Sequence, residues 1–129
     1  MKNVAEQIRQ MPNSLFGKGC SMEEIHSAEE LLGLSFADDY RQYLLDVGTA
    51  AAGGREFTGI GSELRTHVVA VTECNRNCGS EMLKTMYVVE EAGYDGIVAW
   101  QNSNGEIFEN IFGSEPLKVA DSFAEYLKI

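Results

Sequence analysis

The chain of 129 residues lacks long apolar runs, and this absence limits where it can reside. No stretch approaches the roughly 20 apolar residues that a membrane helix needs, so the sequence predicts no membrane span. Met1–Met11 carries Lys2 and Arg9 without an apolar run, which does not fit a signal peptide. We therefore expect a cytoplasmic protein.

Cysteine is also scarce, with Cys20, Cys74 and Cys78 as its only occurrences. An odd number of cysteines in a reducing compartment indicates free thiols rather than a disulfide framework.

Basic residues are the scarcer charged type. Ten Lys and Arg stand against 20 Asp and Glu, which gives a formal net charge of -10. Nucleic-acid binders need a basic surface, because phosphate contacts supply most of their affinity, and an anionic membrane would also repel this chain. The charge predicts no nucleic-acid partner and no membrane partner. It favours solubility and attraction to a cationic protein.

What remains is the composition of a folded domain. Hydrophobic residues make up 44% of the chain. A chain of this length suits one domain and can bury roughly two thirds of its unfolded surface. No linker, repeat or low-complexity stretch divides it, so we expect a single domain over residues 1–129 with no predictable oligomeric state.

Helical signals dominate the first part of the chain. Apolar spacing predicts a short helix within Lys2–Met11. A second helix is expected over Ser21–Gly33, because it starts with a capping box and ends on a glycine. A third is expected from a Ser35 cap to Gly48. Its apolar face would contain Tyr40, Tyr43, Leu44 and Val47.

The middle of the chain is harder to assign. Arg55–Thr58 predicts at most a short strand inside an Ala- and Gly-rich stretch. The spacing within His67–Cys78 fits a helix, although Val68–Val71 alone would also suit a strand, and we favour the helix. Ser122 is expected to cap a last helix.

A three-strand antiparallel meander is the clearest prediction. Met86–Glu91, Ile97–Gln101 and Glu106–Ile111 are rich in β-branched and aromatic residues. They are separated by Asp95-Gly96 and Asn104-Gly105, which accept the positive φ angles of tight hairpin turns.

Sequence motifs for phosphate binding, nucleophilic hydrolysis and metal binding are largely missing. The glycines around Gly53 lack the Lys-Ser/Thr of a phosphate-binding loop, and there is no G-x-S-x-G. On a helix, His67 and Cys74 would lie about 10 Å apart, too far for a compact zinc site. A carboxylate-pair glycosidase stays open, because any acidic chain offers such pairs. We expect no catalytic residue, no cofactor and no metal.

The distribution of charge is more informative. Gly19–Tyr40 and Thr85–Leu117 each contain six carboxylates and no Lys or Arg. Helix N-termini explain most of the first group, since their dipoles favour anions. The second group is either a partner surface or a solvated face, and we favour the partner surface. The predicted contact residues are Glu90, Glu91, Tyr94, Asp95, Glu106 and Glu109, with Tyr94 as an aromatic anchor.

Three stretches resemble the SUKH superfamily, which includes bacterial toxin-immunity proteins and fungal cell-wall assembly regulators. They are Ile25–Leu45, Met86–Val98 and Ala120–Leu127, in the order that the family shows. Ala37 stands where the family usually has Pro, and Gly48 is followed by Thr49 instead of a second Gly. Neither departure threatens the fold.

The resemblance implies an α+β fold with a mostly antiparallel sheet, including the three-strand meander, and helices packed against it. It also implies an immunity protein that neutralises a cognate toxin, often a nuclease or a nucleic-acid-modifying domain. The alternative is a non-catalytic regulatory or scaffold module that binds a cellular protein. The family has no shared catalytic set, and toxin contacts differ among its members.

Overall fold

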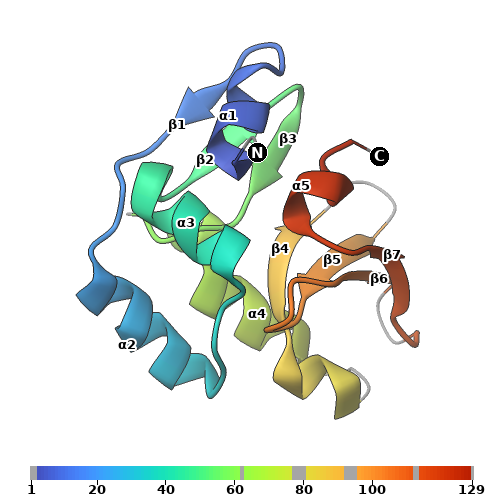
Figure 1. Ribbon diagram of the computed structural model, residues 1–129. Helices are drawn as coiled ribbons and strands as arrows, with labels where there is room; N and C mark the ends of the chain where they lie inside the picture. The colour runs from blue at the N-terminus through green and yellow to red at the C-terminus, as the bar shows by residue number, and fades with distance from the viewer. Residues whose placement is uncertain (1–2, 62, 77–80, 92–95, 112–113, 129) are drawn as a thin grey trace.

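The computed structural model describes residues 3–61, 63–76, 81–91, 96–111 and 114–128 (Figure 1). The helices are α1 (Val4–Arg9), α2 (Met22–Leu32), α3 (Asp38–Val47), α4 (Val68–Arg76) and α5 (Phe123–Tyr126), with 3₁₀ helices η1 (Leu64–Thr66) and η2 (Glu81–Thr85). The strands are β1 (Leu15–Phe16), β2 (Ala50–Ala52), β3 (Arg55–Phe57), β4 (Tyr87–Glu91), β5 (Ile97–Gln101), β6 (Ile107–Ile111) and β7 (Leu117–Ala120). In these ranges no helix is long and apolar enough to cross a membrane.

The strands form one sheet in chain order, from β1 to β7, and every neighbouring pair is antiparallel. The expected α+β class and the central meander of β4, β5 and β6 are confirmed. The joint between β3 and β4 is narrow, because Phe57 and Glu90 are its one registered pair. The Thr58 N–H, which donates to the Val89 carbonyl at 2.9 Å, and the ion pair between Arg55 and Glu90 also connect the two strands.

The sheet carries a hydrophobic cluster on each face. The larger cluster joins α1, α3 and α5 to one face, through Ile8, Leu44 and Phe123. The smaller cluster lies on the other face, where Val71 of α4 packs with Trp100. In Figure 1, α2 lies at the periphery beside α3, and α5 lies next to β7.

Local signals placed α2 correctly. The Ser21 hydroxyl accepts from the Glu24 N–H at 3.2 Å, and the Glu24 carboxylate accepts from the Ser21 N–H at 3.0 Å. Gly33 ends the helix with a φ of 72°. The predicted helices at the N-terminus, over His67–Cys78 and after Ser122 are also present as α1, α4 and α5.

The predicted cap of α3 is wrong. The N-cap of α3 is Ala37, and no side chain caps it. Ser35 lies further upstream, where its carbonyl oxygen accepts from the Ser103 hydroxyl at 2.6 Å. The backbone between α2 and α3 is held instead by Glu29, whose carboxylate accepts from the Phe36 N–H at 2.8 Å.

The sequence predictions missed β1, β2 and β7. These strands are short, and β2 consists entirely of alanine, a residue that is uncommon in strands. The turn after β5 also differs in detail, since Gly105 has a φ of 97° while Asn104 is not among the positive-φ residues. The Asp95 part of the other predicted turn lies outside the described residues.

Glu29 gives the fold a defined pH dependence. Burial opposes ionisation of this carboxyl, but the Phe36 N–H and the Arg41 guanidinium at 2.9 Å outweigh it and lower the pKa of Glu29. A lowered folded-state pKa adds stability above the unfolded value of about 4.3, and that stability is lost as the pH falls through the folded value.

We therefore expect Glu29→Gln to lower the free energy of unfolding at pH 7 and to flatten its fall in acid. Urea titrations at pH 7 and at about pH 3 measure both effects. Glu30→Gln, an exposed neighbour on α2, is the control and should match the wild type. Parallel pH profiles for Glu29→Gln and the wild type would contradict this role of Glu29.

Candidate protein-binding surface

Glu90, the first of the predicted contact residues, is not at the surface. It is 3% exposed, and Arg55 donates to both carboxylate oxygens, at 3.0 and 2.7 Å. The Tyr126 hydroxyl donates to the same carboxylate at 2.5 Å. Glu90 is thus a structural anchor between β3, β4 and α5, and its predicted place on a partner surface is corrected.

Glu91 and Glu106 lie on the face of the sheet that carries the smaller cluster. Glu91 is registered with Val98 and accepts from the Asn75 amide at 3.0 Å. Glu106 accepts from Lys118 at 2.9 Å, and Lys118 is registered with Phe108. The Lys118 ammonium and the Asn102 amide lower the pKa of Glu106.

Glu109 lies on the opposite face. It is half-buried and is registered with Ala99, which belongs to the larger cluster. Tyr94 and Asp95 lie outside the described residues. The predicted carboxylates are therefore divided between the two faces, and one rigid partner could contact only part of the set.

Cations from other parts of the chain approach the acidic stretch, which the sequence did not predict. Thr85–Leu117 contains no Lys or Arg, yet Arg55 reaches Glu90 and Lys118 reaches Glu106. The pairing is incomplete, because Lys118 also binds Asp121 at 2.6 Å. A cation shared by two carboxylates leaves the cluster with one net negative charge.

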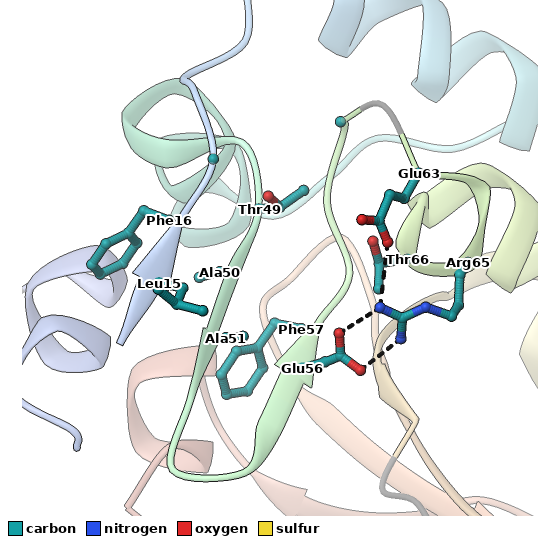
Figure 2. A pocket seen from close by; sticks show the side chains of 12 residues that line it. Leu15, Phe16, Thr49, Ala50, Ala51, Glu56, Phe57, Glu63, Arg65 and Thr66 are labelled. Carbon is teal, nitrogen blue, oxygen red and sulfur yellow. Dashed lines mark hydrogen bonds and ion pairs between the residues drawn. The ribbon is translucent and has the colours of Figure 1, made fainter. Parts of the chain in front are cut away.

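A second cation that binds two carboxylates lies in a groove of about 210 Å³ between β1, β2, β3 and η1 (Figure 2). Arg65 binds both oxygens of Glu56, at 2.6 and 2.7 Å, and one oxygen of Glu63 at 3.3 Å. Leu15 lies at the other side of the groove and is 72% exposed. The glycines and Thr49 that line it were not predicted as site residues.

The groove in Figure 2 offers little for acid–base chemistry. The Arg65 hydrogen bonds are the largest influence on Glu56 and lower its pKa. A general base works best with a pKa near neutrality, so this carboxylate is poorly tuned for proton abstraction. The ion pair is exposed, and exposed pairs add little to stability because water and salt screen them.

The cysteines and histidines do not converge on a reactive site in the described part of the chain. Burial raises the pKa of Cys20 to about 11, so its thiol stays protonated at neutral pH and is a weak nucleophile. Cys74 is exposed and free, and Cys78 lies outside the described residues. No group of three potential metal ligands occurs among the residues described.

The comparison with family models found one match over the entire chain. The model SUKH_5, described as SMI1-KNR4 cell-wall, covers residues 1–129. A search of curated proteins found no match.

Proposed function

The chain belongs to the SUKH superfamily, and from that premise we propose that it is an immunity protein that binds and neutralises a cationic toxin domain. Family membership supports a toxin-immunity or SMI1/KNR4-like protein-binding role in general, and the family's proteins are generally non-catalytic. The proposed toxin is a nuclease or a nucleic-acid-modifying domain. A surface that binds polyanions is itself cationic, so an acidic protein can cover it.

The shared cations are the observation that carries this proposal. Lys118 serves two carboxylates, and Arg65 serves two more. Each of these two clusters therefore keeps one net negative charge, and the chain as a whole carries a formal charge of -10. Within the acidic stretch, Glu91 and Glu106 on one face and Glu109 on the other remain alternative proposed contacts, together with Tyr94 and Asp95.

Such charge should act mainly on the rate of association. Raising the salt from about 0.01 M to about 1 M shortens the Debye length from about 30 Å to about 3 Å. We expect the association rate constant with the toxin domain encoded beside this gene to fall at least about 10-fold, while the dissociation rate constant changes less. Stopped-flow mixing measures both rates, and coexpression in a toxin-sensitive host tests neutralisation. An association rate constant that does not change with salt concentration would contradict the electrostatic part of the proposal. A host that is not protected from the toxin by coexpression would contradict the immunity function itself.

The second candidate is a non-catalytic regulatory or scaffold module that recruits a cellular protein. The description of the matching family model, which refers to the cell wall, favours it. The genes next to this one discriminate between the two functions. A toxin gene immediately upstream supports immunity, and its absence favours the regulatory module.

A further inference from the structure

A groove on the larger-cluster face of the sheet has the features of a docking surface. It has a volume of about 250 Å³ and lies where β5, β6 and β7 meet, at the end of the sheet marked by Ile97. α5 packs on the same face at the other end of these strands, where Ile107 and Ala120 are buried. The apolar lining consists of Ile97, Ile111, Leu117 and Val119.

Two of these side chains are unusually exposed for their size. Leu117 is 72% exposed and Ile111 is 55% exposed. Scattered apolar side chains are normal on a protein surface, but these two converge on one concavity. Burying them against a partner would stabilise the complex, because it removes apolar surface from water.

The polar rim of the groove is acidic. Glu109 and Glu115 line it and take part in no ion pair among the described residues. The nearest cation in sequence, Lys118, is registered with Phe108 on the opposite face and is occupied by Glu106 and Asp121. By contrast, the carboxylates of the groove in Figure 2 already bind Arg65.

We propose that this groove receives a segment of the partner protein in which one large apolar side chain is flanked by Lys or Arg. The inference rests on the proposed function and assigns it to one face of the sheet. The volume is below the roughly 300–1,000 Å³ of typical small-molecule sites, and it suits a single anchoring side chain. A second copy of this chain fits poorly, because a symmetric contact would place Glu109 and Glu115 against their own copies.

The test compares two matched double variants in binding to the toxin domain encoded beside this gene. Leu117→Ala with Glu115→Lys alters the groove, whereas Leu31→Ala with Glu30→Lys makes the same changes on the exposed face of α2. Titration calorimetry should show at least about 10-fold weaker binding for the groove variant and less than about twofold for the α2 variant. All four positions are exposed, so both variants should keep the wild-type urea midpoint.

Each other outcome counts against a defined part of the argument. If the wild type binds and the groove variant binds equally well, the groove is not the docking surface while the proposed function stands. If the wild type does not bind, both the proposed function and the inference about the groove are contradicted. If the wild type sediments as a dimer that the groove variant converts to a monomer, the occupant is a second copy and the inference is overturned.

Discussion

Arg55→Leu is expected to destabilise the protein by about 3–5 kcal/mol, because it leaves the buried carboxylate of Glu90 without its counter-charge. The Glu90 side chain is 4% exposed, and Arg55 holds both of its oxygens. The Arg55 guanidinium also lies 5.2 Å from the ring centres of Phe57 and Tyr126, so its removal costs packing as well. Urea unfolding measured at pH 7 gives the difference in free energy.

A matched arginine shows whether burial is the cause. Arg65 also makes a two-oxygen ion pair, with Glu56, but both side chains are exposed. Arg65→Leu should therefore leave the urea midpoint close to that of the wild type. Equal losses for the two variants would contradict the structural role given to Glu90.

The double variant Arg55→Leu with Glu90→Leu should recover part of the loss at pH 7, because it removes the buried charge that Arg55→Leu alone leaves unpaired. Urea unfolding of the wild type, the single variant and the double variant under the same conditions measures the recovery.

Elements with strong local signals could be predicted from the sequence. The capping box at Ser21 and the left-handed glycine at Gly33 define α2 through contacts within a few residues. The β4–β6 meander follows from β-branched and aromatic runs separated by turn residues. Strand β2 has no comparable signal, since its alanines form a strand only through pairing with β1 and β3.

The contact residues were harder to predict, because their burial also depends on partners far away in the chain. Alternation along a strand correctly puts Glu90 and Glu91 on opposite sides, but it does not say which side is buried. The answer depends on Arg55, which is 35 residues away in the chain. Counting charges within one stretch could not reveal this long-range partner.

The groove between β5, β6 and β7 could not be predicted either, because the exposure of its residues depends on how the rest of the chain packs. Ile111 and Leu117 have the residue types of a buried strand, and sequence alone would place them in the core. Both are exposed, whereas Ile107 and Ala120 on the same face are buried in one cluster with Phe123 of α5. The position of a packed helix, which the composition of the strands does not reveal, thus distinguishes the buried apolar residues from the exposed ones.

Three backbone segments meet at Gly48 with no room for a side chain. The Gly48 N–H donates to the Leu44 carbonyl at 3.0 Å, and the Ile60 N–H donates to the Gly48 carbonyl at 3.0 Å. A Cβ at Gly48 would overlap the Lys18 carbonyl oxygen, and a Cβ at Gly59 would overlap the Gly48 carbonyl oxygen. The close approach of these segments fixes the end of α3 against the chain that leads into α2.

Gly48→Ala should therefore lower the free energy of unfolding by about 2–6 kcal/mol. Gly48 has a φ of 74° and a ψ of -55°, and holding a non-glycine residue in such a conformation costs about 1–3 kcal/mol. Displacing the Lys18 backbone adds about 1–3 kcal/mol of overpacking. Since domains of this kind are stable by only about 5–15 kcal/mol, the variant should lose much of its stability.

Gly33→Ala is the control for an ordinary left-handed backbone without a clash. Gly33 has a φ of 72° and a ψ of 33°, and a Cβ there would meet nothing within 4 Å, so its substitution should cost only roughly 1–2 kcal/mol. Urea midpoints of the two variants, read with the wild type at one pH, give the comparison directly. A loss at Gly48 no larger than the loss at Gly33 would mean that the Lys18 segment moves aside freely, and that the crossing of the three segments does not hold α3 in place.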